Sequence, residues 1–505
     1  MTALALLPAA MLIRAGTVVP ASTVPRFMLA PEAWADLGER LLADPLPLAT
    51  LWAEEGAVHA LFLEAPDPEA PDPEAGDAQG WGRPLIASVP VEARRYLALS
   101  TSRPGISPCE RMIRDMWGIE AIRALDLRPW LDHGHWGLTA PLSPRPGPGV
   151  WPPEPPEFPG GADDEAAGLF QLGLGPVQSF TTGAAHLRLS LDGERIARLE
   201  VRLGYGHRGV VRLILGRTPL EAAMLVSRID AQATVAHGCA FARAVEAALG
   251  WRITARAEGL RAMMLELERT ALHLHHLEAT ARQARLDHAG QLAAWLREAV
   301  LRGCAAAFGH RMMMDAVVPG GLAATPSEAG LVALPEVLDR LEASLPELRR
   351  SLGVSMGTRP GDATAARRLS GQAMLDPALA SRCVFGGPTG DAAARCRTRL
   401  DEVARSAAVV RRLLLVDPAG PVRGDPPPAR DLFEPAVEGA GMAMSVHGPV
   451  WHWLRIEAGR LSALHWHDPG LPGWQALEQA AVGLELDEFR LLCASIGLSI
   501  AGADR

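Results

Sequence analysis

A run of prolines across residues 141–159 divides the chain into two parts. The run holds nine prolines, and because proline fixes φ and lacks a backbone N–H, neither a long helix nor a central strand can pass through it. Such a run is typical of a semi-rigid spacer between domains. We therefore expect a first domain over residues 1–140, a linker over 141–165 and a second domain over 166–505.

The first part shows the mixed pattern of a small α+β domain. Apolar runs at residues 58–63 and 85–91 predict strands, and the patterns at 33–42 and 108–117 predict helices. Between the two strands, residues 64–78 repeat the sequence APDPE twice, which predicts an extended, solvated loop.

The second part begins with strand patterns and then changes to helical periodicity. The predicted strands are residues 186–191, 195–202 and 210–215, and the predicted long helices include residues 256–281, 291–314 and 391–415. A hairpin at 449–466 and a last helix close the chain. The expected fold class is α+β, with a small N-terminal α+β domain followed by a mainly helical domain with flanking β hairpins.

Composition indicates a globular protein and disfavours nucleic acid as a partner. Hydrophobic residues make up 48% and charged residues 21% of the chain, and the net charge is −9 with no block of Lys or Arg. Six cysteines stand singly, without a CxxC pair, as is typical of reduced thiols in a cytosolic protein. Residues 1–21 are interpreted as the first strand or helix, and no uncharged apolar run is long enough to predict a membrane span.

Residues 109–119 (CERMIRDMWGI) carry the first resemblance to a known family. Together with Asp126-Leu127-Arg128, they resemble the signature of the C subunit of respiratory complex I and its hydrogenase counterparts. The first domain is therefore expected to be a C-subunit-like domain.

Several motifs in the second part resemble the D subunit of complex I, which belongs to the hydrogenase large-subunit superfamily. They occur in the family's order and comprise residues 203–209 (LGYGHRG), 228–230 (RID), 265–269 (LELER), 309–313 (GHRMM) and 319–321 (PGG). The resemblance implies a fused C–D subunit of the kind found in group-four hydrogenases and their relatives.

The nickel ligands of those hydrogenases are replaced in this sequence. Two CxxC pairs hold nickel and iron there, because soft thiolates suit both metals. The resemblance places the first pair at Asp230 and Ala233, and the second pair at Ser499 and Gly502. We therefore expect no metal on this chain and no hydrogen activation at nickel.

The quinone-binding residues of complex I are also replaced. The resemblance places a His in the first hairpin loop and a Tyr after the Arg-x-Asp element, where this chain has Thr182 and Ala231. Thr182 keeps a hydrogen-bonding hydroxyl, whereas Ala231 has none. Val211 stands where an acid usually follows the HRG motif. Thr182 and Arg228 are the candidate residues of an acceptor cavity.

Four residues are candidates for proton transfer in the former active-site cavity: Asp230, His207, Arg208 and Asp504. Asp230 is either a proton-carrying carboxyl with a raised pKa or the partner of Arg228 in a structural ion pair. His207 and Arg208 either line the cavity or contact an iron–sulfur subunit. A lone His on an apolar helix, such as His237, is more often a core residue than a proton carrier.

Other suggestive patterns have ordinary interpretations. Histidines 273, 275 and 276 do not converge on one ligand sphere if they lie on a helix, so zinc is disfavoured. Residues 386–390 (GGPTG) lack the Lys of a phosphate loop. Four histidines alternate with apolar residues in the C-terminal hairpin and predict its solvent-facing side, namely His447, His452, His465 and His467.

The resemblance implies a peripheral-arm subunit of a membrane-bound, NADH:quinone oxidoreductase-like or group-four hydrogenase-related electron-transfer complex. The implied partners are a small iron–sulfur subunit, which holds the cluster, and membrane-embedded antiporter-like and H-like subunits. Through these partners, this cytoplasmic chain is expected to lie peripherally on the inner face of the cell membrane. Two roles stay open: a cavity for a quinone or another acceptor, and a catalytically inactive subunit that docks the iron–sulfur protein onto an ion-translocating membrane module. A free-standing enzyme is disfavoured because no nucleophile–base pair is recognisable.

Overall fold

The computed structural model describes residues 8–20, 22–64, 83–149, 168–353, 390–428 and 435–504. The predicted loop at 64–78 and the predicted linker at 141–165 fall largely outside these ranges, as does most of residues 386–390. Helices and strands are mixed, so the α+β fold class is confirmed.

The N-terminal part is built on a five-stranded sheet in the order β1-β2-β5-β4-β3, in which β2 and β5 are parallel and the other neighbours antiparallel. Its elements are α1 Ala9–Arg14, β1 Thr17–Val18, β2 Arg26–Met28, α2 Pro31–Arg40, β3 Leu48–Glu54, β4 Ala57–Glu64, β5 Arg83–Pro90 and α3 Ser107–Trp117. The predicted strands and helices of this part are confirmed within a few residues. Strands β3 and β4 are buried along almost their whole length. Both faces of the sheet are therefore covered.

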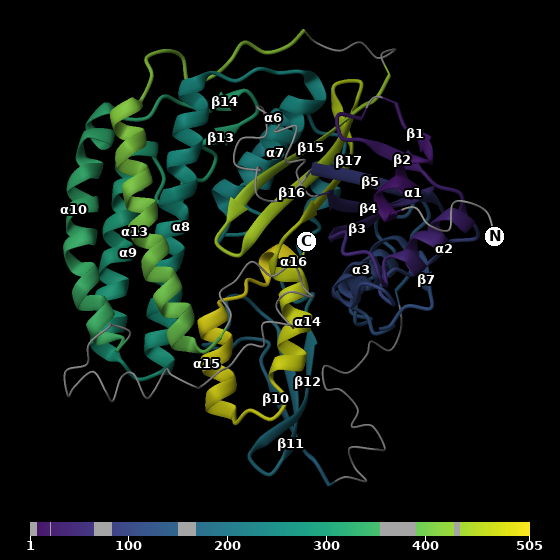
Figure 1. Cartoon of the computed structure of the whole chain (residues 1–505), viewed down its shortest axis with the longest axis horizontal. Helices are drawn as coiled ribbons and strands as arrows, with labels where there is room; N and C mark the ends of the chain where they lie inside the picture. The colour runs from purple at the N-terminus through teal and green to yellow at the C-terminus, as the bar shows by residue number, and fades with distance from the viewer. Residues whose placement is uncertain are drawn as a thin grey trace.

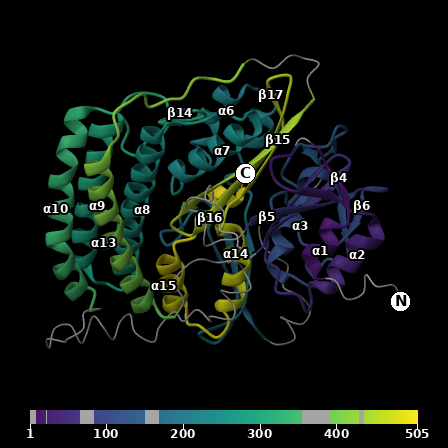
Figure 2. The same ribbon diagram turned by 45° about the horizontal axis from the view of Figure 1, so that its top comes forward.

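Four long helices form the far end of the second part and stand side by side in Figure 1. They are α8 Ala255–Gln283, α9 Asp287–Phe308, α10 Glu328–Ser351 and α13 Ala392–Val416. The three long helices predicted from periodicity are confirmed, except that α9 ends at Phe308 and not at residue 314. Trp295 on α9 is 51% exposed. Figure 2 shows this bundle and the N-terminal part at opposite ends of the molecule.

A three-stranded antiparallel sheet lies between the two ends, with β15 Val437–Ser445, β16 Gly448–Glu457 and β17 Arg460–His467. One face packs on the almost wholly buried helix α7 Thr234–Leu249. Gly439 and Gly441 permit this contact, because a Cβ on either would collide with the α7 backbone at Ala244 or Ala240. The other face of the sheet packs on the N-terminal sheet through tryptophans such as Trp453.

This burial on both faces overturns the prediction for the four hairpin histidines. His447, His452, His465 and His467 are at most 7% exposed, so they do not form a solvent-facing side. Alternation with apolar residues predicts a solvent-exposed face only when one face of the sheet is uncovered. Here α7 covers one face of the β15–β17 sheet and the N-terminal sheet covers the other.

Two further predictions are corrected at the ends of the second part. Residues 210–215 form helix α5 Val210–Ile214 instead of a strand, and the helix starts after Gly209 at φ +63°. The single last helix is three helices, α14 Gly470–Ala480, α15 Leu486–Ile496 and α16 Ala501–Asp504. The remaining elements are β10 Phe170–Leu174, β11 His186–Asp192, β12 Arg195–Arg202, α6 Pro219–Val226, and the short strand pairs β6 Arg95–Leu97 with β7 Glu120–Ile122, β8 Leu138–Thr139 with β9 Gly147–Pro148, and β13 Val317–Val318 with β14 Gly321–Leu322.

Candidate functional site

The turn before α7 and the C-terminal segment meet inside the molecule. Ser499 pairs with the backbone of Thr182, and the Ile500 N–H donates to the Thr182 carbonyl at 3.3 Å. The Ser499 hydroxyl donates to the carboxyl of Asp230. Two of the four positions matched to nickel ligands are thus in direct contact, although they are far apart in the sequence.

Asp468 occupies the space beside Gly502. Asp468 follows β17 directly, and its Oδ1 accepts from the Gly470 N–H at 2.7 Å. A Cβ built on Gly502 would collide with Oδ2 and Cγ of Asp468. A side chain at position 502 and the carboxylate of Asp468 therefore cannot share this space.

Asp230 and Asp468 form a buried pair of carboxyl groups, 3% and 5% exposed. Burial and the nearby charge of Asp468 raise the pKa of Asp230, against the hydrogen bonds from the Gln232 N–H, at 2.8 Å, and from Ser499. Burial also opposes ionisation of Asp468, but the hydrogen bond and charge of His237 hold the pKa of Asp468 below its usual range. The pair therefore favours a proton on Asp230 and a charge on Asp468.

Two histidines extend this pair into a line of hydrogen-bonding groups. Nε2 of His237 lies 3.3 Å from Oδ2 of Asp468, and its Nδ1 lies 2.9 Å from Nε2 of His452. Both imidazoles are 0% exposed. Because an imidazole can take a proton at one nitrogen and release one at the other, the arrangement can shift a proton between Asp468 and the core of the sheet.

Glu268 on α8 is a third buried carboxyl near the cluster. It accepts from the N–H groups of Val235 and Ala236 at 2.6 and 3.1 Å, which are first-turn donors of α7. Burial, with a further contribution from Asp230, raises the pKa of Glu268 from 4.5 to about 8. Glu268 is therefore poised to exchange a proton near neutral pH.

Arg228 and Arg208 hold the turn before α7 and do not line the cluster. Arg228 forms a partly exposed ion pair with Asp315, with Nη2 at 2.7 Å from Oδ2, so the predicted structural pair with Asp230 is wrong. Arg208 donates at 2.5 Å to the carbonyls of Arg228 and Ile229. Both arginines thus fix the backbone from which Asp230 projects.

The other predicted site residues have separate surroundings. His207 stacks on Trp136 at 4.6 Å, a contact between the two parts of the chain. Thr182 is exposed, yet its Oγ1 accepts from Nε2 of Gln232 at 3.0 Å, which links it to the cluster. The side chain of Asp504 lies outside the described part of the structure.

Four residues of this site were missed as site residues from the sequence, and His237 among them was interpreted as a core histidine. Asp468 lies in no motif, and His452 was assigned to a solvent-facing strand position. Glu268 did carry a signal, because it belongs to the LELER segment of residues 265–269 that matches the family's D-type chains. We use the term buried acid–histidine cluster below for Asp230, Asp468, His237, His452 and Glu268.

The residues at the four positions that the resemblance assigns to nickel ligands do not fit a nickel–iron centre. They offer a carboxyl already bound to Ser499 and two positions, Ala233 and Gly502, without any donor atom. Within the described ranges, no group of three or more His, Cys, Asp or Glu side chains is arranged to hold a metal ion. Five cysteines are free and buried at other places in the core.

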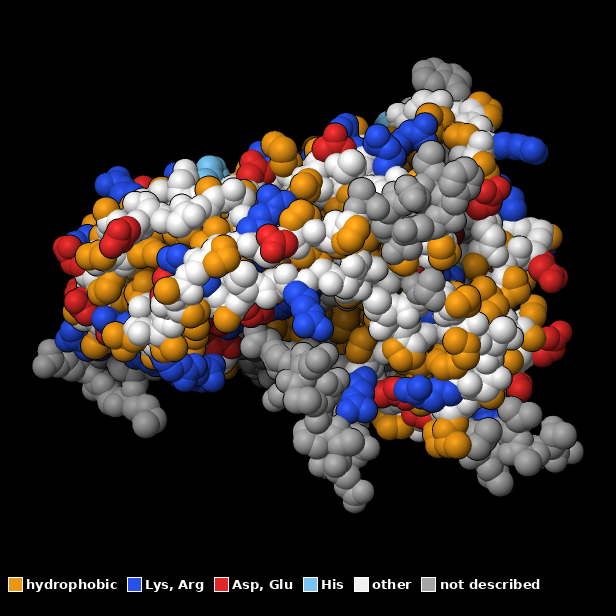
Figure 3. All heavy atoms as spheres, turned by 90° about the horizontal axis from the view of Figure 1, so that it is seen from above, with side chains coloured by type: hydrophobic (Ala, Val, Ile, Leu, Met, Phe, Trp, Pro, Cys, Tyr) orange, Lys and Arg blue, Asp and Glu red, His pale blue; other side chains and the backbone are white. Residues whose placement is uncertain are grey.

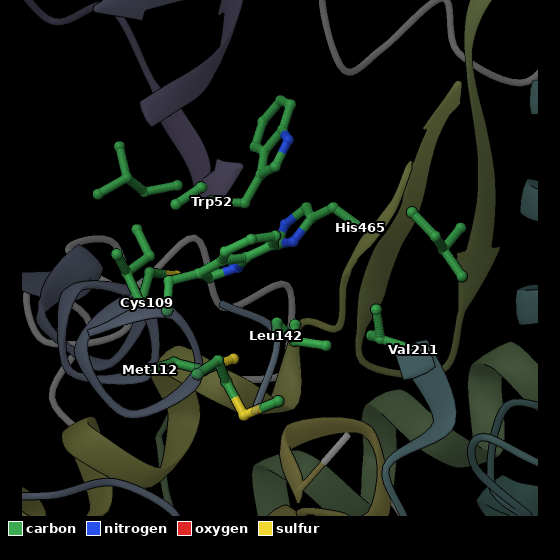
Figure 4. A pocket seen from close by; sticks show the side chains of 12 residues that line it. Trp52, Cys109, Met112, Leu142, Val211 and His465 are labelled. Carbon is green, nitrogen blue, oxygen red and sulfur yellow. The ribbon is translucent and has the colours of Figure 1, made fainter. Parts of the chain in front are cut away.

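Two small cavities lie beside Val211 and Ala231, the positions where the resemblance implies polar residues of an acceptor site. One lies at the seam between the two parts of the chain, measures about 40 Å³, and is lined by apolar side chains such as Val211, with Trp52 stacked on His465 at 4.8 Å along one wall (Figure 4). The other, of about 30 Å³, lies beside Ala231 and reaches Glu268. Pockets for drug-sized ligands usually measure roughly 300–1,000 Å³. Neither cavity has the room of such a pocket.

Comparison with known proteins links this site to a family. Residues 208–281, which carry Asp230, His237 and Glu268, match the model of the nickel-dependent hydrogenases. The D subunit of an NADH-quinone oxidoreductase from Dehalococcoides mccartyi is 29% identical over 66% of this chain and 98% of its own length. The carbon monoxide-induced hydrogenase of Rhodospirillum rubrum is 24% identical over 66% of this chain and 99% of its own.

A solved structure shares the fold. A chain of the membrane-bound sulfane sulfur reductase, an archaeal respiratory membrane complex, superposes with a TM-score of 0.58 at 22% identity, over 67% of this chain and 98% of that one. The similarities together confirm the resemblance drawn from the motifs.

Proposed function

We propose that this homologue of NADH-quinone oxidoreductase subunits and hydrogenase large subunits is a peripheral subunit of a membrane-bound electron-transfer complex, in which it handles protons without activating hydrogen. The observation that carries the proposal is the carboxylate of Asp468 in the space beside Gly502, joined to His237 and close to Asp230. The resemblance implies metal-binding thiolates at positions 230, 233, 499 and 502, whereas this chain has Asp230 and the neighbouring Asp468 carboxylate in that region.

The partners follow from the homologues. These belong to membrane-bound oxidoreductase and hydrogenase complexes, so we propose a membrane module as one partner and a small iron–sulfur subunit as the electron-carrying one. No helix in the described ranges is long and apolar enough to cross a membrane, so contact with the membrane would be made through those partners. The face in Figure 3 carries acidic and basic side chains close together, without a basic stripe.

A cavity that holds a whole quinone headgroup is the less favoured role. The hollows beside Val211 and Ala231 measure about 40 and 30 Å³, and Arg228 is engaged by Asp315. These observations disfavour acceptor binding at Val211, Ala231 and Arg228.

Assembly is tested by affinity purification of the tagged chain from detergent-solubilised native membranes, with partners identified by mass spectrometry and metals quantified in the same sample. We expect an iron–sulfur subunit, membrane proteins and iron without nickel. Recovery of the chain alone and free of metal would overturn the proposed assembly, and stoichiometric nickel would overturn the proposed loss of hydrogen chemistry.

A further inference from the structure

A surface cavity of about 120 Å³ lies next to the buried acid–histidine cluster, between the loop that holds Thr182 and the C-terminal half of α8. Its lining includes His275 and His276, together with Glu278 and Arg282. One water needs roughly 10–15 Å³ of such volume, so the cavity has room for several waters.

His276 is the buried wall of this cavity and is 1% exposed. Neither of its ring nitrogens has a hydrogen-bond partner among the described residues. The ring packs against Gly497, where a Cβ would lie 2.5 Å from Cδ2 of His276. Because unpaired buried nitrogens are costly, the cavity side of His276 is a natural position for ordered water.

A second imidazole continues inward from His276. The rings of His276 and His447 are 5.2 Å apart, and His447 sits in the turn between β15 and β16, where it is 7% exposed. His447 hydrogen-bonds to the backbone of Gly497 and lies within electrostatic reach of Asp468, while its Nε2 has no partner among the described residues. On the outer side, the ring of His275 is 5.7 Å from that of His276.

We propose that His275, His276 and His447, with water in the adjoining cavity, form a proton inlet from solvent to Asp468. The inlet rests on the proposed function, since it supplies the cluster that would handle protons. A proton would pass from water to one nitrogen of His276 while the other nitrogen releases a proton toward His447, so each imidazole ends neutral. The last step, from His447 to the carboxylate of Asp468, would run through water, because these two described side chains share no direct hydrogen bond.

The surroundings of His276 and His447 favour imidazoles that stay neutral. Burial, followed by the charge of Arg399, lowers the pKa of His276 well below its usual range and that of His447 to about 4. His273 also faces both imidazoles; its Nε2 lies 2.5 Å from Oε2 of Glu402, and burial lowers the pKa of His273 to about 4, so this ring is neutral as well. Imidazoles that stay neutral can accept and release protons without trapping them.

A competing route leads from exposed Thr182 through Gln232 to Asp230. The side-chain amide of Gln232 donates to Thr182, and its backbone N–H donates to Asp230. An amide side chain is a poor proton carrier, since it must rotate or tautomerise for each transfer, whereas an imidazole does not. The two routes share the same cavity but diverge at His276, so variants of that residue separate them.

The test follows exchange of the Asp230 carboxyl proton for deuterium in the purified full-length chain, by time-resolved infrared spectroscopy after transfer into heavy water. The carboxyl signal is assigned by its loss in Asp230→Asn. We expect His276→Ala and His447→Phe to slow the exchange about tenfold or more, as for a barrier raised by about 1.4 kcal/mol, and free imidazole to restore the rate in His276→Ala.

His288→Ala is the matched control, because His288 is an exposed histidine on α9. Wild-type exchange rates in both inlet variants would overturn the inlet while the protonated Asp230 of the proposed function stands. A wild-type chain without any signal from a protonated Asp230 would overturn both. Should His276→Ala fail to fold, His447→Phe alone decides by the same criterion.

Discussion

The carboxylate of Asp468 lies where a side chain on residue 502 would lie, and only the glycine at that position leaves it room. Asp468 is in turn fixed by the Gly470 N–H and by His237. The missing side chain at 502 and the buried carboxylate are therefore one structural feature, and a change at either position must affect the other.

Gly502→Ala is expected to destabilise the protein by about 1–3 kcal/mol, the usual cost of overpacking, because the new methyl group displaces Asp468. The same substitution at Gly259, on α8 with open space around its Cβ, should stabilise by roughly 0.5–1 kcal/mol through helix propensity. Denaturant unfolding of both variants tests whether the two substitutions change the free energy of unfolding in opposite directions. A stabilising Gly502→Ala would contradict the placement of Asp468.

Glu268 should make the free energy of unfolding fall as pH rises from about 4.5 to about 8. Over this window the folded chain keeps the proton on Glu268, whose pKa is about 8, while the unfolded chain has lost it. Glu268→Gln keeps a neutral acceptor for the N–H groups of Val235 and Ala236, so the variant should lose less stability over the window. Chemical denaturation at several pH values measures the two slopes, and equal slopes would refute the buried protonated state.

Two arginine ion pairs should contribute very different amounts to the free energy of unfolding. Arg261 is 0% exposed and donates to Glu246 at 2.7 and 3.1 Å, so Arg261→Met should cost about 3–5 kcal/mol by leaving that carboxylate buried and unpaired. The Arg228 pair with Asp315 is half exposed, and Arg228→Met should cost no more than about 1 kcal/mol. Comparable losses in thermal unfolding would contradict this ranking.

Trp52 should be a main contact across the seam between the N-terminal sheet and the sheet of β15 to β17. It is 4% exposed and packs on Trp453 at 5.3 Å and on His465. Trp52→Ala is therefore expected to cost about 3–5 kcal/mol. Trp295→Ala is the matched control, since Trp295 is 51% exposed, and its loss should be about 1 kcal/mol or less. A wild-type unfolding midpoint in Trp52→Ala would show that the seam contributes little.

The sequence predicted the elements whose patterns are local. The helices at 256–281 and 391–415 and the strand at 195–202 agree with α8, α13 and β12 because periodicity and turn residues specify them. Helix α5 was missed because its five residues, VVRLI, suit a short strand equally well, and the choice depends on packing. The hairpin histidines were misplaced because no local pattern reveals that a second sheet covers the outer face.

The candidate site was predicted only in part, because local sequence patterns do not reveal which distant segments meet in the fold. The resemblance identified Asp230, Thr182, Ser499 and Gly502, and the first three of these are joined by contacts between segments far apart in the sequence. Asp468 was not identified, since its role comes from a collision in space with position 502 and not from any spacing along the chain. The domain boundaries at 140 and 165 stay predictions.

The central claim is that the buried acid–histidine cluster takes up or releases protons as electrons pass through the complex. Reduced-minus-oxidised infrared difference spectroscopy of the purified complex tests it most directly, with Asp230→Asn and, as a surface control, Asp487→Asn, since Asp487 is exposed on α15. The account predicts a carboxyl difference signal in the wild type and in Asp487→Asn that is absent from Asp230→Asn. A wild-type spectrum without any carboxyl change between the two redox states would contradict it and leave a structural subunit as the better description.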